Sequence, residues 1–172
     1  AKTFRKQYFE HLASFFRSVF GMKLTDAQLL ANIDDIVATC CAIKARIVEQ
    51  DEFDTGLRML LNFGHTLGHA VEQHFGYSGF THGEGVAIGM YQLTKRTEEL
   101  GMTAKGSAER IKSVLEKYNL PLTAGVEKAQ LLDTMARDKK KNGNSITLII
   151  LQQIGEGVLQ KVDWQEVPKY LG

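Results

Sequence analysis

The chain has 172 residues, of which 44% are apolar and 24% charged, and both values are ordinary for a globular protein. Its formal net charge of +1 argues against bulk attraction to nucleic acid or to an anionic membrane, and it contains no apolar run long enough to span a bilayer. We therefore expect one folded domain over residues 1–172, with neither nucleic acid nor membrane as a partner. The two cysteines, Cys40 and Cys41, are adjacent, and we expect them to be reduced core residues of a cytoplasmic protein.

Apolar residues at helical spacing dominate the first three-quarters of the chain. The residues Thr25 to Gln28 have the form of a capping box before the second of these stretches. Prolines occur at positions 121 and 168 alone, so they do not break the long periodic stretches. The pattern predicts helices over residues 4–20, 29–49, 56–75, 84–100, 108–118 and 128–136.

The pattern changes near the end of the chain. Residues 145–152 are apolar and rich in β-branched side chains, and a glycine-containing turn separates them from a second short run over residues 158–162. This predicts a β-hairpin, with a closing helix over residues 164–171. The fold class is thus mainly α, a multi-helical domain with a small β-hairpin near residues 145–162. Without a Gly-x-Gly-x-x-Gly motif, the chain is not expected to hold a dinucleotide by itself.

The helix predicted over residues 56–75 has one polar face with the composition of a binding site. At about 100° per residue, a stripe roughly 60° wide holds Arg58, Asn62, His65 and His69. A solvated face is usually built from lysine, glutamate and alanine, whereas these side chains suit an oxyanion or a metal. The opposite side is apolar and is expected to face the core: Met59, Leu60, Phe63, Leu67, Ala70 and Val71.

Two glycines, Gly64 and Gly68, flank this stripe. Each costs about 1 kcal/mol of helix stability relative to alanine. Their presence predicts a close approach by a ligand or by another backbone.

His65 and His69 are four residues apart and can reach one ion. The zincin motif needs a glutamate directly after the first histidine, and Thr66 occupies that place, so a metalloprotease is excluded. A third histidine, His82, lies in the predicted glycine-rich loop over residues 76–83. If the loop folds back, three of the five histidines meet. Two histidines plus a carboxylate, with one position open, have the composition of a catalytic zinc centre.

Residues 58–72, RMLLNFGHTLGHAVE, and residues 82–90, HGEGVAIGM, resemble the motif of the 3-dehydroquinate synthase family. Residues 136–140 and the predicted hairpin resemble that family's later lysine motif and hairpin, so the similarity covers about residues 43–157. It implies a carbon–oxygen lyase of the shikimate route to aromatic amino acids. The substrate is a seven-carbon keto-acid phosphate, 3-deoxy-D-arabino-heptulosonate 7-phosphate (DAHP), and the products are 3-dehydroquinate and phosphate.

The resemblance also implies cofactors and partners. The family uses NAD and a divalent metal, normally Zn²⁺ or else Co²⁺, and is expected to form cytoplasmic homodimers. This chain resembles the helical, C-terminal half, so the N-terminal NAD-binding α/β domain is expected to be absent from it. The half alone is expected to be inactive.

Roles for individual residues follow from the same resemblance. His65 and His82 match two metal ligands, and the third ligand is expected to be a glutamate lying just before Ala1. His69 matches a residue near the departing phosphate, and Lys44 matches a catalytic lysine that contacts the substrate. The matches to substrate-binding positions are Arg58, Asn62 and one of the two lysines Lys139 and Lys140. The family has a glutamate where Asp54 stands, so any hydrogen bond from that position must be made by a shorter side chain.

Three alternatives remain open at this point. The first is another sugar-phosphate cyclase, of the 2-deoxy-scyllo-inosose or 2-epi-5-epi-valiolone synthase type. The second belongs to a different class, a non-catalytic helical module that binds metal or anions. The third, a metal-dependent alcohol dehydrogenase of the glycerol dehydrogenase type, is disfavoured by the block from Asn62 to His69.

Overall fold

The computed structural model describes residues 31–142 and 144–171. The predicted helix over residues 4–20 and the predicted capping box at Thr25 lie outside these ranges. The chain divides into two compact units, with the boundary between Leu61 and Asn62.

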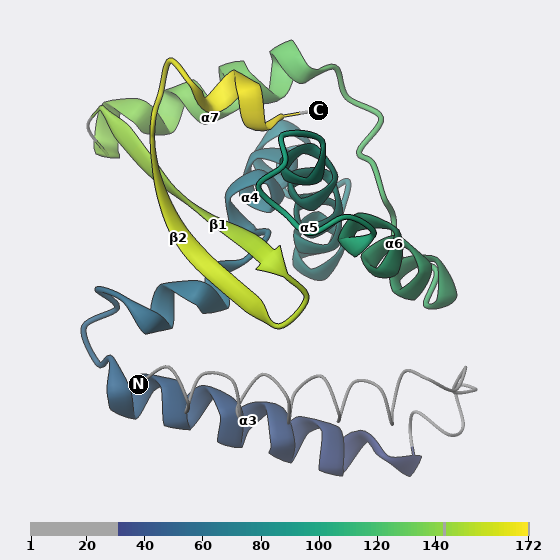
Figure 1. The fold of residues 1–172 in the computed structure, drawn as a ribbon. Coiled ribbons are helices and arrows are strands. Elements are labelled where there is room, and N and C mark those ends of the chain that lie inside the picture. The colour runs from purple at the N-terminus through teal and green to yellow at the C-terminus, as the bar shows by residue number, and fades with distance from the viewer. Residues whose placement is uncertain (1–30, 143, 172) are drawn as a thin grey trace. The chain divides into compact units, whose positions relative to one another are not determined.

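The first unit contains helix α3 (Ile33–Gln50; Figure 1), which agrees with the helix predicted over residues 29–49 along its described length. Its first turn carries Asp34 and Asp35, which favour the positive end of the helix dipole. Cys40 and Cys41 are free thiols, but both are exposed, so the expected core placement is wrong. Among the described side chains of α3, the buried one is Ile47, so the two cysteines lie on a helix that is mostly exposed along its described length.

Asp51 organises the turn after α3. Its Oδ2 accepts backbone N–H bonds from Gly56 at 2.8 Å and Arg58 at 3.0 Å, and its Oδ1 accepts one from Thr55 at 3.0 Å. The bond from Arg58, followed by that from Thr55, holds the pKa of the Asp51 carboxyl below its usual range. These bonds lead the chain into a short 3-10 helix, η1 (Leu57–Asn62).

The single helix predicted over residues 56–75 is wrong, because the chain breaks between η1 and helix α4 (His65–His74). The break falls at Gly64, whose φ of 83° is left-handed and costs little for glycine alone. A Cβ on Gly64 would lie 2.7 Å from the carbonyl oxygen of Val86, so the site has no room for a side chain. The proposed stripe from Arg58 to His69 is therefore not one continuous helical face, although His65 and His69 do share α4.

Helix α5 (His82–Glu99) begins two residues before the predicted start. Its N-cap is Thr81, whose backbone N–H donates to Glu84 Oε2 at 2.8 Å, while Thr81 Oγ1 accepts the N–H of Glu84 at 3.4 Å. This capping box makes His82 the first residue of the helix, whereas the sequence prediction placed it in a loop.

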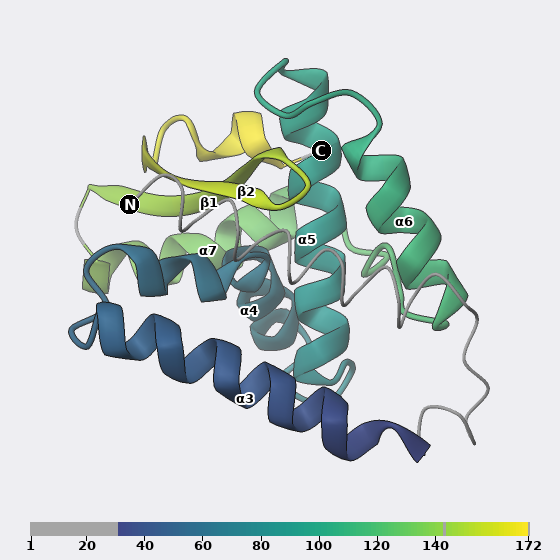
Figure 2. The ribbon, with the colours of Figure 1, turned by 60° about the horizontal axis from the view of Figure 1, so that its bottom comes forward.

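Helices α4 and α5 cross at glycines. A Cβ on Gly68 would lie 2.9 Å from the carbonyl carbon of Gly85, and a Cβ on Gly89 would lie 2.0 Å from the carbonyl oxygen of Gly64. The close approach predicted at Gly64 and Gly68 is thus made by another backbone. In Figure 2 the two helices lie together, with α6 (Ser107–Lys117) on one side of α5 and the hairpin on the other.

The rest of the second unit covers this helix pair. Helix α7 (Lys128–Asn142) packs against α4 and is longer than the predicted 128–136. The predicted hairpin is confirmed as antiparallel strands β1 (Ser145–Gln153) and β2 (Glu156–Asp163), which pair Ile149 with Leu159. Of the predicted closing helix, residues 164–171, only a 3-10 helix η2 (Val167–Tyr170) forms.

The core of the second unit lies between α4, α5, α7 and the hairpin. Leu67, Ala70 and Val71 are buried as predicted, but Phe63, Met59 and Leu60 are partly exposed. The side chains that form the main cluster are Leu67, Ala70, Leu93, Met135, Leu148, Ile150, Val162, Val167 and Leu171. Among the described residues, no helix is both long and apolar enough to cross a membrane.

Helix α6 takes its N-terminal cap from a neighbouring helix. Its N-cap residue, Gly106, has no side chain, and Glu98 of α5 instead accepts the N–H groups of Gly106 at 2.7 Å and Ala108 at 2.9 Å. Those two bonds, led by the one from Ala108, hold the pKa of the Glu98 carboxyl below its usual range.

We expect Glu98→Gln to destabilise the protein by about 1 kcal/mol at pH 7, because the amide keeps one accepting oxygen and loses the other together with the negative charge. Because the folded-state pKa is lowered, this contribution is present above the unfolded-state pKa of about 4.3 and is lost as the pH falls through the folded-state value. Urea unfolding should therefore show a larger difference from wild type at pH 7 than at pH 3. The control is Glu99→Gln, which removes an exposed ion pair with Arg96 and should change stability by less than about 0.5 kcal/mol.

Candidate metal centre

Three histidines meet at the crossing of α4 and α5, as the sequence predicted. The ring centroids of His65 and His82 are 5.0 Å apart, those of His65 and His69 are 5.5 Å apart, and those of His69 and His82 are 5.7 Å apart. His65 and His69 come from successive turns of α4, and His82 comes from the first turn of α5.

His65 is half-buried, with its Nδ1 3.3 Å from the carbonyl oxygen of Phe63. Burial lowers the pKa of His65, and the neighbouring His82 and His69 lower it further against the opposing effect of the Phe63 bond. The lowered pKa favours the neutral imidazole. With Nδ1–H donating to the carbonyl, the lone pair is on Nε2, where a cation can bind it.

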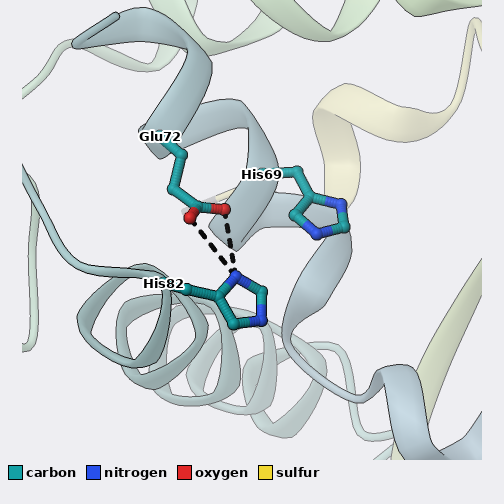
Figure 3. Close-up of side chains that lie close together, drawn as sticks. All are labelled: His69, Glu72 and His82. Carbon is teal, nitrogen blue, oxygen red and sulfur yellow. Dashed lines mark hydrogen bonds and ion pairs between the residues drawn. The ribbon is translucent and has the colours of Figure 1, made fainter. Parts of the chain in front are cut away.

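His82 has a carboxylate beside the same ring nitrogen. Its Nδ1 lies 3.3 Å from each carboxylate oxygen of Glu72, a buried residue of α4 that is 8% exposed (Figure 3). Figure 3 also shows His69 and Glu72 projecting from α4 toward His82.

The donor set fits a divalent cation of the zinc type. Two imidazoles bound to one tetrahedral ion at about 2.0 Å place their centroids roughly 5 Å apart, close to the spacings found here. Ligand atoms of His69, Glu72 and His82 also lie within 4.8 Å of one another. Two ligand sets are thus geometrically possible, one built on His65 and His82 and the other on His69, Glu72 and His82.

Sequence reasoning missed two features of this centre. Glu72 stands three residues after His69, one helical turn further along α4, and this spacing identifies it as a candidate. The Thr81-x-x-Glu84 pattern of the capping box precedes an apolar run, and it could have placed His82 on a helix.

The other predicted site residues belong to other elements of the chain, η1, α3 and α7. Asn62 is exposed at the end of η1, three residues before His65. In the first unit, Lys44 is exposed on α3, and Arg58 donates from Nη1 to the carbonyl oxygen of Glu52 at 2.9 Å. The side chains of Lys139 and Lys140, near the end of α7, lie outside the described ones.

Solved structures share the fold. A 2-deoxy-scyllo-inosose synthase, solved with carbaglucose-6-phosphate, NAD⁺ and Co²⁺, matches 81% of this chain and 40% of its own, with a TM-score of 0.67 and 19% identity. A 2-epi-5-epi-valiolone synthase from Streptomyces hygroscopicus, solved with NAD⁺ and Zn²⁺, matches 95% of this chain and 45% of its own, with a TM-score of 0.68 and 18% identity.

Curated relatives are closer in sequence. The 3-dehydroquinate synthase of Clostridium acetobutylicum is 46% identical over 147 residues, which are 85% of this chain and 41% of the relative. That of Enterococcus faecalis is 39% identical over the same shares of the two chains. The chain thus spans about two-fifths of the length of these relatives. The model of the 3-dehydroquinate synthase C-terminal family matches residues 4–141. The chain therefore belongs to the 3-dehydroquinate synthase C-terminal family.

Proposed function

We propose that the complete protein is a 3-dehydroquinate synthase, which converts DAHP into 3-dehydroquinate and phosphate. The observation that carries this proposal is the centre formed by His65, His69 and His82 in a chain 46% identical to a relative of that name. This chain supplies the helical part, which binds metal and substrate as a single domain. A preceding α/β domain completes the protein.

His65 and His82 hold the divalent cation through Nε2. This assignment is supported by their Nδ1 atoms, each of which faces an acceptor within the protein, the Phe63 carbonyl or the Glu72 carboxylate. The resemblance adds a glutamate before Ala1 as the third ligand. When bound, Zn²⁺ or Co²⁺ supplies Lewis-acid polarisation of substrate oxygens.

The substrate carries a carboxylate and a phosphate, so cationic and donor side chains bind it. Arg58 has the planar fork that pairs with a carboxylate, and Asn62 donates and accepts hydrogen bonds at substrate hydroxyls. His69, one turn beyond a ligand, donates to the departing phosphate. Two further contacts come from Lys44 and from one of Lys139 and Lys140.

NAD bound mainly by the preceding domain supplies a transient oxidation, and the net redox change is zero. We also propose a cytoplasmic homodimer, as the family resemblance implies. The cofactor assignment is supported by the structural neighbours, which were solved with NAD⁺ and Co²⁺ or Zn²⁺.

The strongest enzymatic alternative is another sugar-phosphate cyclase, because the solved neighbours are of that kind. Their identity to this chain is 18–19%, whereas that of curated 3-dehydroquinate synthases reaches 48%, and this difference favours DAHP as the substrate. The alternative of another class, a non-catalytic metal- or anion-binding module, predicts metal binding without turnover.

The test is release of inorganic phosphate by the complete protein supplied with NAD and Zn²⁺. We expect phosphate and 3-dehydroquinate to form in equal amounts from DAHP, activity to disappear on chelation, and Zn²⁺ or Co²⁺ to restore it. Glucose 6-phosphate is the control substrate and should release none. A folded, metal-loaded protein that leaves DAHP intact would overturn the proposal, and turnover of glucose 6-phosphate instead would establish the cyclase alternative.

A further inference from the structure

The carboxylate of Glu72 is buried, and among the described residues it pairs with one side chain, that of His82. Both of its oxygens lie 3.3 Å from Nδ1 of His82, and the residue is 8% exposed. Burying a carboxylate is costly unless hydrogen bonds compensate it. We therefore expect the contact between the buried carboxylate and the ring nitrogen to serve a function.

The helix crossing gives Glu72 its position. A Cβ on Gly85 would lie 3.4 Å from Cγ of Glu72 and 3.1 Å from the carbonyl oxygen of Gly68, so the small residue in α5 leaves space for the stem of the glutamate. The carboxylate can therefore contact His82 in the first turn of α5.

The His82 ring has few other restraints. Its backbone is fixed by the capping box of Thr81 and Glu84, but its side chain is 56% exposed, so packing does not select the orientation of the ring. The contact with Glu72 does select it. A carboxylate oxygen accepts from a ring N–H, so the contact favours the proton on Nδ1, and in the neutral ring the lone pair is then on Nε2.

We propose that Glu72 is a positioning residue that orients His82 and fixes its tautomer for cation binding, without itself being a metal ligand. This inference rests on the proposed function, because it takes His82 as a ligand. The matching environment of His65, whose Nδ1 faces the Phe63 carbonyl, supports it. Hydrogen bonding of the distal nitrogen to a carboxylate or carbonyl is the usual support for a metal-bound histidine.

The first test reads the tautomer directly in the metal-free complete protein. Nitrogen-15 NMR of labelled histidines should show His82 with its proton on Nδ1, with His82→Asn identifying the resonance. In Glu72→Ala the proton should move largely to Nε2, and in Glu72→Gln it should stay on Nδ1, because the amide oxygen still accepts. An Nε2–H tautomer in the wild type, or no change in Glu72→Ala, would overturn the inference.

The second test reads Co²⁺ binding by competition with a chelator and by visible absorption. Glu72→Ala should weaken Co²⁺ binding by about 10- to 100-fold, as loss of such a support does, while the absorption bands of the bound ion stay in place. Glu72→Gln should recover most of the affinity. Glu109→Gln, a change of an exposed glutamate on α6, is the matched control and should bind like the wild type.

The outcomes separate the inference from the function. Shifted absorption bands in Glu72→Gln would mean that Glu72 is itself a ligand, and unchanged affinity in Glu72→Ala would mean that it does not act on His82. Either result overturns the inference while metal-dependent phosphate release from DAHP stands. A wild-type protein that binds no Co²⁺ would instead overturn the proposed function.

Discussion

Replacing Gly89 with alanine is expected to destabilise the unit of residues 62–171 by about 3 kcal/mol or more, at the severe end of overpacking effects. The added Cβ would lie 2.0 Å from the carbonyl oxygen of Gly64 and 3.1 Å from the backbone nitrogen of Gly68. Backbone atoms cannot rotate aside as a side chain can, so α4 and α5 would have to separate. Urea unfolding followed by circular dichroism measures the loss, and hydrogen exchange locates it in these two helices.

Gly83 offers the matched control on the same helix. A Cβ there would meet no atom within 4 Å, and its φ is not left-handed. Gly83→Ala should therefore leave stability unchanged or raise it by about 0.5 kcal/mol. If Gly89→Ala were as stable as Gly83→Ala, the close crossing of α4 and α5 described here would be wrong.

Local patterns predicted the parts of the fold that depend on local physics. The apolar and β-branched residues of 145–152, with glycine at 155, were enough to predict the hairpin. Helical spacing located α5, α6 and α7 to within a few residues, except where α7 continues to Asn142.

The break at Gly64 could not be predicted in the same way. A glycine inside a periodic stretch is compatible with a continuous helix, and nothing local requires its positive φ. That conformation is tied to α5, whose Val86 carbonyl and Met90 side chain occupy the space of a Cβ. The break thus depends on a partner some twenty residues further along the chain.

The site was predicted in part for a related reason. The convergence of His65, His69 and His82 needed only one helix and a returning loop, and it is confirmed. The contact between Glu72 and His82 depends on the direction that α5 takes relative to α4. The spacing of residues along α4 does not determine that direction. The exposure of Cys40 and Cys41 was missed because residue type was taken as evidence of burial.

The second large effect is expected from His65→Ala. Removing a metal ligand should weaken Zn²⁺ or Co²⁺ binding by about a thousandfold, which corresponds to the part of the metal-binding free energy that one ligand contributes in a typical site. In contrast, His69→Ala should leave metal affinity within about threefold of wild type and lower kcat by about 10²- to 10⁴-fold, as loss of a proton donor does. Chelator competition gives the affinities, and phosphate release from DAHP gives the rates.

The comparison decides between the two ligand sets that the geometry allows. If His69, Glu72 and His82 were the ligands, His69→Ala would lose metal and His65→Ala would retain it, the reverse of what we expect. Equal loss in both variants would mean that the two histidines have been given the wrong roles. His74→Ala, at the far end of α4 and against Phe75, controls for damage to the helix and should keep both metal and turnover. Our expectation depends on Nδ1: in His65 that atom faces a protein acceptor, which leaves Nε2 for the cation.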